Sequence, residues 1–351
     1  MKLQTTIEIS SPEQLIGLRN RIAFLGSCFA ENIGMRMRQS GLPALVNPFG
    51  VLYNPLSILQ ALTQNPLNDN LYFEDEDHLW HCWLTDSSKN ASSQAACKAG
   101  ILSARGRLFD WNPDVVIITL GTNRYYELIP LPVSGGLSAG APSPSSSPTL
   151  PSSPSPSCSP SSSSPFSPSS SSPSPSPLVV GNCHKRPQTL FAEKELTVEQ
   201  MVTILESICM LFPRARVILT VSPYRYQKYG FHESRLSKAA LLLAVDAIQR
   251  KRPEQVSYFP AYEIQLDELR DYRFYAEDML HPSSQAIEYI WERFSARFLD
   301  SEAHRFLSDY EPIRKALMHR PTNPESPAAV RFHEQTHQRL SEIISKYNIE
   351  L

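Results

Sequence analysis

The stretch RIAFLGSCFAENIG, from Arg21 to Gly34, decides the fold. It begins with an unbroken apolar run, turns at Gly26 and Ser27, and continues into a helical pattern from Glu31 to Gln39. Three other apolar runs also end at Gly, Ser or Pro: DVVIITLGT (114–122), ARVILTVSP (215–223) and QVSYFPA (255–261). Short runs of this kind are typical of buried strands in a parallel sheet.

Helical patterns fall between these runs. They cover Thr197 to Phe212 before the third run, Glu233 to Arg250 after it, and Ser283 to Phe298 after the fourth. Strands that alternate with helices favour a doubly wound architecture. We therefore predict an α/β fold, a flavodoxin-like three-layer α/β/α sandwich with a mostly parallel sheet.

Two segments stand apart from this pattern. An insertion at about 134–178 consists almost entirely of Ser and Pro between Ala141 and Pro177, a composition that predicts disorder. After an α/β domain at 1–300, residues 301–351 form a C-terminal extension with helical patterns at 302–318 and 327–347. We expect these helices either to pack on the sheet domain or to mediate association into oligomers.

Composition narrows the functional classes. The 351 residues include 33 Lys and Arg against 35 Asp and Glu. With so small a net charge, the electrostatic potential of the whole protein does not favour nucleic acid or a membrane surface as partner. The N-terminal residues lack a signal-peptide pattern and no segment is apolar enough for a membrane span, which predicts a cytoplasmic protein. Six scattered cysteines predict free thiols and no structural zinc site.

Polar residues that follow the apolar runs should meet at one rim, because ligands bind at the carboxyl ends of strands in such sheets. Ser27 comes directly after Gly26, at a turn where the next helix would point free N–H groups at a developing oxyanion. This placement fits a nucleophile. The alternative is that Ser27 caps the helix, a frequent function of serine.

Asp278 and His281 lie three residues apart in EDMLHP, close enough for a carboxylate and an imidazole to share one side of a turn. Pro282 disfavours helical geometry at His281, which places the pair on a loop. The pair matches the base and its orienting group in a serine triad. The alternative is a helix cap with a surface ion pair.

Further candidates remain open at this stage. Asn123, in LGTN, and Gly50, in NPFG, could donate to an oxyanion, and both sequences are also ordinary turns. Cys28 is the rival nucleophile, because a thiol at a helix N-terminus can have a lowered pKa. We prefer Ser27, since the residue directly after the glycine is placed to face the rim.

A series of motifs resembles the bacterial GSCFA domain family, a branch of the SGNH/GDSL-like hydrolase superfamily. The resemblance covers roughly Leu25 to Phe298. The motifs are, in order, GSCFAENIG, NPFGVLYNP, GTNRYYE, GNCHK, TVSPYR, SKAALLLA and DYRFYAEDMLHPS.

The resemblance implies specific functions for the site residues. Ser27 would be the nucleophile, with Asp278 and His281 as orienting group and base. Ser27 and Gly50 N–H groups and the Asn123 amide would form the oxyanion hole, with Asn182 in GNCHK as the alternative to Asn123.

The implied activity is that of an esterase that needs no metal or cofactor and acts on an O-acyl ester of a sugar or other small molecule. An acyltransferase with the same triad and a non-catalytic acyl- or sugar-binding module are the alternatives. Ester turnover that is lost in Ser27→Ala would separate an enzyme from a binding module.

Overall fold

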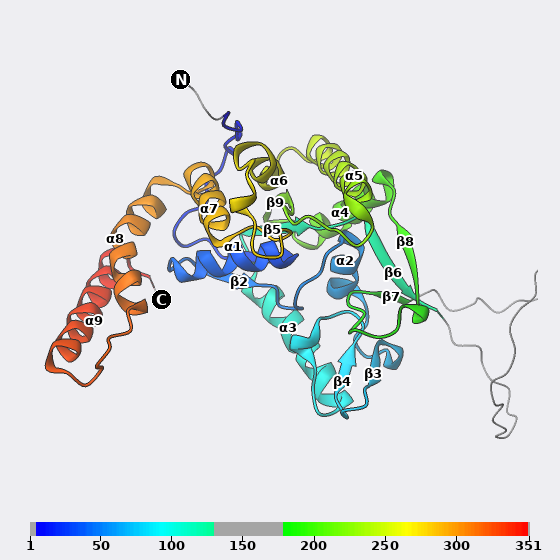
Figure 1. Cartoon of the computed structure of the whole chain (residues 1–351), viewed down its shortest axis with the longest axis horizontal. Helices are drawn as coiled ribbons and strands as arrows, with labels where there is room; N and C mark the ends of the chain where they lie inside the picture. The colour runs from blue at the N-terminus through cyan, green and yellow to red at the C-terminus, as the bar shows by residue number, and fades with distance from the viewer. Residues whose placement is uncertain (1–4, 130–177, 350–351) are drawn as a thin grey trace, which may run out of the picture. The chain divides into compact units, whose positions relative to one another are not determined.

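The computed structural model describes residues 5–129 and 178–349 and contains a five-stranded parallel sheet (Figure 1). Its strands lie in the spatial order β10-β9-β5-β1-β2, and every neighbouring pair is parallel. Numbered along the chain, this is the 2-1-3-4-5 order of flavodoxin-like sheets. The predicted fold class is confirmed. The strands are β1 (Ile22–Gly26), β2 (Ala44–Val46), β5 (Val115–Leu120), β9 (Arg216–Val221) and β10 (Val256–Tyr258).

Helices cover both faces of the sheet. Successive residues of a strand point to opposite sides, so apolar strands present two apolar faces that must be buried. Ile22 and Phe24 belong to one core cluster and Ala23 and Leu25 to the other. The first cluster includes α1 (Cys28–Gln39) and α7 (Ser284–Phe298). The second includes α2 (Pro55–Thr63), α3 (Gln94–Trp111), α4 (Val198–Leu211) and α5 (Gly230–Lys251).

The helices α1, α4, α5 and α7 agree with the predicted ones, whereas α2 and α3 were not predicted. The short helix α6 (Ala261–Glu263) follows β10 and continues into a helical turn at Ile264–Glu268. Residues 134–177 of the predicted disordered insertion at about 134–178 lie outside the described residues, and Leu178 is the first residue of a strand.

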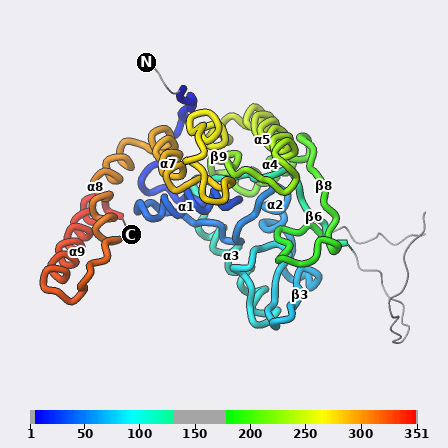
Figure 2. Tube along the Cα trace, viewed as in Figure 1, coloured from blue at the N-terminus to red at the C-terminus, as the bar shows by residue number. Residues whose placement is uncertain are grey.

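Two small antiparallel sheets accompany the main sheet, and neither was predicted. One pairs β3 (Tyr72–Glu74) with β4 (Trp80–Cys82); the other has the order β7-β6-β8, formed by β6 (Arg124–Leu128), β7 (Leu178–Val180) and β8 (Phe191–Glu195). Figure 2 shows the segment after β4 beside the segment after β7. Backbone bonds join them, since the N–H groups of Gly181 and Asn182 both donate to the Trp83 carbonyl.

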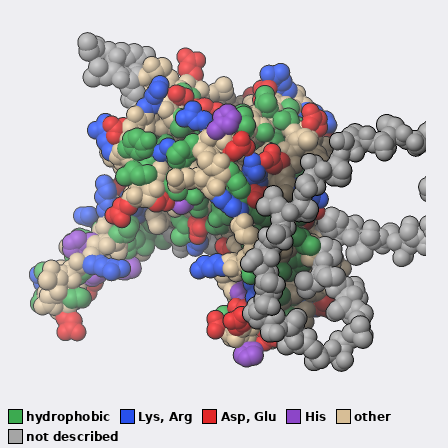
Figure 3. Space-filling view, turned by 45° about the vertical axis from the view of Figure 1, so that its right-hand side comes forward, with side chains coloured by type: hydrophobic (Ala, Val, Ile, Leu, Met, Phe, Trp, Pro, Cys, Tyr) green, Lys and Arg blue, Asp and Glu red, His purple; other side chains and the backbone are tan. Residues whose placement is uncertain are grey.

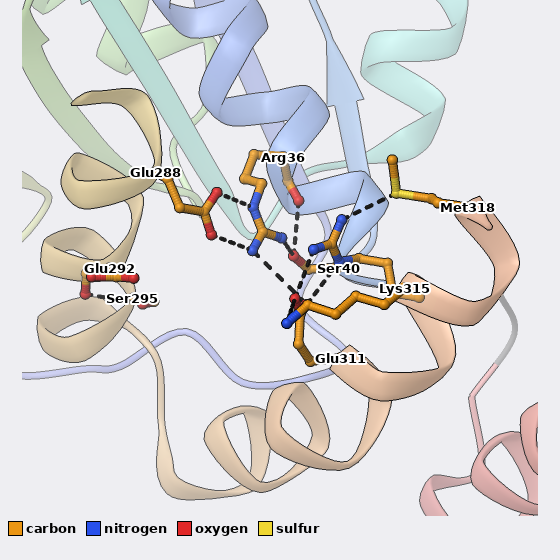
Figure 4. A network of polar contacts seen from close by, with 9 residues as sticks. Arg36, Ser40, Glu288, Glu292, Ser295, Glu311, Lys315 and Met318 are labelled. Carbon is orange, nitrogen blue, oxygen red and sulfur yellow. Dashed lines mark hydrogen bonds and ion pairs between the residues drawn. The ribbon is translucent and has the colours of Figure 1, made fainter. Parts of the chain in front are cut away.

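The C-terminal helices α8 (Ser301–Met318) and α9 (Pro327–Tyr347) pack on the sheet domain. Phe306 of α8 and Tyr347 of α9 belong to the core cluster that contains α1 and α7. A polar network reinforces this contact (Figure 4): Arg36 of α1 donates to both carboxylate oxygens of Glu288 on α7, at 2.6 and 2.7 Å, and approaches Glu311 of α8 at 4.0 Å. Such bidentate pairs add geometric specificity to the packing.

Charged side chains of both signs are interspersed over the face shown in Figure 3, in keeping with the formal net charge of -2. Among the described helices, none is both long and apolar enough to cross a membrane.

Candidate active site

A cavity of about 370 Å³ lies at the carboxyl ends of β1, β5 and β9. It includes the edge between β1 and β5, where the strand order reverses and ligands bind in such sheets. Residues that follow all three strands line it, as the topology predicts: Ser27, Cys28, Gly121, Thr122, Ser222 and Tyr224. His281 comes from the distant loop before α7, and Tyr53, Asn54 and Asn182 come from other loops.

Ser27 occupies the helix N-cap position of α1 but does not cap the helix with its side chain. The residue is 1% exposed, and its Oγ has no hydrogen-bond partner within the described part of the chain. Gly26 makes this turn sterically accessible: it has φ +130°, and a Cβ there would lie 2.2 Å from the Thr119 carbonyl oxygen. The Ser27 hydroxyl thus lies at the cavity without a hydrogen-bond partner among the described residues, which is unusual for a buried polar group.

Asp278 and His281 form the expected pair. His281 Nδ1 lies 2.5 Å from Asp278 Oδ2, and Asp278 Oδ1 accepts the N–H groups of Leu280 and His281 at 2.9 Å each. The hydrogen bond from the His281 side chain, followed by these backbone bonds, lowers the pKa of the Asp278 carboxyl to about 2. Asp278 is thus a carboxylate at any working pH.

Two neighbouring residues hold the loop that carries this pair. The Tyr224 ring lies against the imidazole of His281 with the ring centroids 4.3 Å apart. The backbone N–H of Arg225 donates to the Leu280 carbonyl at 3.0 Å, and its guanidinium donates to the Met279 carbonyl at 3.2 Å. His281 and Ser27 line the same cavity but share no hydrogen bond in this structure, since Ser27 Oγ is unpaired.

Three of the expected oxyanion donors already have partners. The Ser27 N–H donates to the Thr119 carbonyl at 3.1 Å, as part of the β1–β5 pairing, and the Gly50 N–H donates to the Asn47 carbonyl at 2.8 Å within a turn. The Asn123 side-chain amide donates to the Leu196 carbonyl at 3.2 Å. Moreover, Gly50 and Asn123 are not among the residues that line the cavity.

Asn182, the alternative to Asn123, does line the cavity. Its Oδ1 accepts the His184 N–H at 2.7 Å, and its Nδ2 amide has no hydrogen-bond partner among the described residues. Asn54 has the same arrangement: its Oδ1 caps α2 by accepting the Ser57 N–H at 2.8 Å. Each of these side chains has its oxygen fixed and keeps an amide donor available at the cavity.

Sequence reasoning did not identify Asn54. The signal was present, because Asn followed by Pro is a common helix start and the side chain of a capping Asn has a fixed orientation. What the signal could not show is that this helix start borders the cavity.

Cys28 also lines the cavity, but burial raises the pKa of its thiol. Bonds to the N–H groups at the start of α1 lower that pKa by less than burial raises it. Since the thiolate is the reactive form of cysteine, this environment weighs against Cys28 as the nucleophile.

Lys238 of α5 is 2% exposed and contacts two of the segments that line the cavity. Its Nζ donates to the carbonyl oxygens of Gly121 at 2.7 Å and Ser222 at 2.8 Å, which joins the segments that follow β5 and β9. Burial lowers the pKa of the amine to about 7. This lysine was not identified by sequence reasoning, because nothing distinguishes it from the other polar residues of a helical pattern.

Within the part of the chain that the structure describes, no group of three or more His, Cys, Asp or Glu side chains is arranged to hold a metal ion. The polar side chains at the cavity include the hydroxyl of Ser27, the imidazole of His281, and the amides of Asn54 and Asn182, groups that can perform acyl transfer by acid–base and nucleophilic catalysis.

Comparison with known families identifies two matching regions. The sequence model of the GSCFA family matches residues 21–132 and 174–294, and that of the GSCFA domain protein, C-terminal domain, matches residues 310–350. No curated protein and no solved structure matches the chain. The first match includes every cavity-lining residue, and its gap falls in the Ser/Pro insertion.

Proposed function

The chain belongs to the GSCFA family, and we propose that it is a serine-dependent acyl hydrolase of the SGNH type. The observation that carries the proposal is that a nucleophilic hydroxyl and an imidazole base line the same cavity. Ser27 presents a buried, unpaired hydroxyl, and His281 presents an imidazole whose Nδ1 is held by Asp278. This is the composition of a nucleophile, a base and an orienting carboxylate.

In the proposed reaction, His281 Nε2 removes the proton from Ser27 Oγ as that oxygen attacks the acyl carbonyl. The alcohol leaves with the proton from His281, and an acyl-enzyme remains. Water, deprotonated by His281, then attacks the acyl-enzyme; the bond to Ser27 Oγ breaks, His281 returns the proton to that oxygen, and the acid is released. The Asp278 carboxylate stabilises the imidazolium that forms in each half-reaction.

The hydrogen-bond donors that would stabilise the oxyanion differ from those expected from the sequence, except for Asn182. The Nδ2 amides of Asn54 and Asn182 are available at the cavity, whereas the Ser27 and Gly50 N–H groups are not. The first N–H groups of α1, which have no intrahelical acceptor, add the positive end of the helix dipole. Loss of one such donor typically costs about 10²–10³ in kcat.

The cavity favours a small, uncharged ester. Four tyrosines line it: Tyr53, Tyr126, Tyr224 and Tyr226. Arg124, the one arginine among the described residues that line the cavity, is already paired with Glu195 at 2.6 Å and Glu233 at 3.1 Å, so it offers no free charge to an anionic substrate. Aromatic walls with hydroxyl groups suit an O-acylated sugar.

We also propose a cytoplasmic, reducing environment for this protein, because the five described cysteines are free thiols.

Labelling with a fluorophosphonate probe tests the proposal. Ser27 should take up the probe, Ser27→Ala should abolish labelling, and Ser222→Ala should retain it, since Ser222 is a second buried serine at the same cavity. Modification mapped to Cys28, or labelling that persists in Ser27→Ala, would contradict Ser27 as the nucleophile.

Hydrolysis of p-nitrophenyl acetate provides the second measurement. Turnover that disappears in Ser27→Ala supports a hydrolase. Stoichiometric binding of an acylated sugar without any Ser27-dependent turnover would instead indicate a binding module. Higher rates with an added alcohol acceptor than with water alone would indicate an acyltransferase.

A further inference from the structure

A second Asp–His pair lies on the β3–β4 hairpin, outside the proposed triad. His81 Nε2 lies 2.5 Å from Asp75 Oδ2, and His81 Nδ1 lies 3.3 Å from Nδ1 of His184. His184 follows β7, and its Nε2 lies 2.8 Å from the Cys82 carbonyl oxygen. The four groups form one continuous chain of hydrogen bonds.

The partners constrain the protons in this chain. A carbonyl oxygen can only accept, so His184 carries a proton on Nε2, and one further proton joins its Nδ1 to Nδ1 of His81. Burial lowers the pKa of His184, which favours the neutral imidazole with Nδ1 as the acceptor.

Aromatic packing keeps this chain of hydrogen bonds in place. The Phe73 ring stacks on His81, with ring centroids 4.8 Å apart, and on Trp83, with centroids 4.0 Å apart. His184 meets both Phe73 and Trp83 edge-on. The charged groups near His184 include Asp86, which favours its protonated form, the adjacent Lys185, and Arg186, whose guanidinium lies over the Phe73 ring.

The backbone at His184 depends on this packing. His184 and Lys185 have φ angles of +47° and +58°, a left-handed conformation that is uncommon for residues other than glycine. The cost of such a conformation must be offset by surrounding contacts. The His184 N–H in this turn is the group that holds Oδ1 of Asn182. Anchoring of the imidazole therefore also fixes the carboxamide of Asn182.

We propose that His184 is a positioning residue: its imidazole, clamped between His81 and the Cys82 carbonyl, holds the turn that aims the Nδ2 amide of Asn182 at the acyl oxyanion. This inference rests on the proposed function. It assigns the β3–β4 hairpin to the oxyanion side of the site, whereas the loop before α7 supplies the base.

A double-mutant cycle tests the coupling. His184→Asn removes the ring and tolerates the left-handed backbone. His78→Asn, on the β3–β4 hairpin that carries His81, is the matched control, because His78 also has a positive φ but is exposed. We expect Asn182→Ala to lower kcat about 10²-fold or more. His184→Asn should lower kcat by about 10-fold or more with little change in KM, and the double variant should be no worse than Asn182→Ala alone. Effects that multiply in the double variant would overturn the proposal.

Nuclear magnetic resonance gives a readout that does not require turnover. The Asn182 carboxamide should be rigid in the wild type and in His78→Asn, and mobile in His184→Asn. The His184 ring should show the neutral Nε2–H tautomer at pH 7. A carboxamide that stays rigid in His184→Asn would overturn the proposal even for an inactive protein, whereas absent Ser27-dependent turnover with the expected mobility change would contradict only the proposed function.

Discussion

The Asp278–His281 and Asp75–His81 pairs have the same 2.5 Å contact in very different surroundings. The side chains of His281 and Asp278 are 43% and 44% exposed, and His281 Nε2 has no hydrogen-bond partner among the described residues. Those of His81 and Asp75 are 9% and 23% exposed, and both nitrogens of His81 are bonded.

The comparison shows that an Asp–His pair does not by itself indicate a base. The ring nitrogen that does not contact the aspartate decides whether the histidine can act as a base, because a base needs a lone pair that can reach the substrate or nucleophile. At His281 that nitrogen is available in a residue that lines the cavity, whereas at His81 it is used to hold His184.

Substitution of the histidine should separate the pairs most strongly. His281→Gln should lower kcat by about 10⁶-fold, as expected when the base of a triad is lost. His81→Phe preserves the ring stack on Phe73, so it should lower kcat far less and instead destabilise the fold by about 1–3 kcal/mol, because buried hydrogen-bonding groups lose their partner. Ester turnover and urea unfolding measure the two effects. Similar kinetic losses in both variants would remove the distinction.

Substitution of the carboxylate should have the next largest effect. Asp278→Asn should lower kcat by about 10⁴-fold with the fold and KM retained, a milder loss than in His281→Gln, because Asp278 fixes the tautomer and stabilises the imidazolium. Asp75→Asn should affect stability more than turnover. If Asp278→Asn leaves turnover unchanged, the site works as a Ser–His dyad, and Asp278 serves only to hold the N–H groups of Leu280 and His281.

Mild acid should destabilise the protein through the buried hydrogen-bonded imidazole of His184, at a higher pH than that at which Asp278 contributes. The pKa of His184 is lowered in the fold, so below the ordinary histidine value of about 6.5 the unfolded chain binds this proton more readily than the folded one. The free energy of unfolding should therefore fall as pH is lowered through this range, and His184→Asn should lack that component. Asp278 contributes only at lower pH, as its pKa of about 2 is approached. Urea titrations at several pH values provide the test, and an identical pH dependence in His184→Asn would contradict it.

The smallest effect is expected for a third acid–base pair, between His78 and Glu74. Its contact is 3.0 Å, but the His78 side chain is 88% exposed. Exposed ion pairs contribute little, so His78→Asn should change the unfolding free energy by less than about 0.5 kcal/mol and leave kcat unchanged. A larger change would mean that the hairpin tip also supports His184.

Much of the fold could be predicted because its signals are local. The apolar runs of β1, β5, β9 and β10 and the amphipathic patterns of α4, α5 and α7 are visible in a short window of sequence. The helix α3 was not predicted because its buried stripe is small and mixed, with Cys97 and Ala104 beside Ile101 and Leu108. The strands β6, β7 and β8 are stabilised by partners distant in sequence, and β3 and β4 are only three residues long, so none of them leaves a periodic pattern.

The sequence by itself determined the parallel sheet, the turn at Ser27, and the contact between Asp278 and His281, since each depends on residues close together along the chain. Only the tertiary structure decided which amide donors are available. Asn123 is engaged by the Leu196 carbonyl, 73 positions away, whereas Asn182 is held by its own turn, which in turn depends on His81, 103 positions before His184. A hydrogen-bond donor is available or engaged according to the acceptors that the folded chain brings to it, and spacing in the sequence does not specify those acceptors.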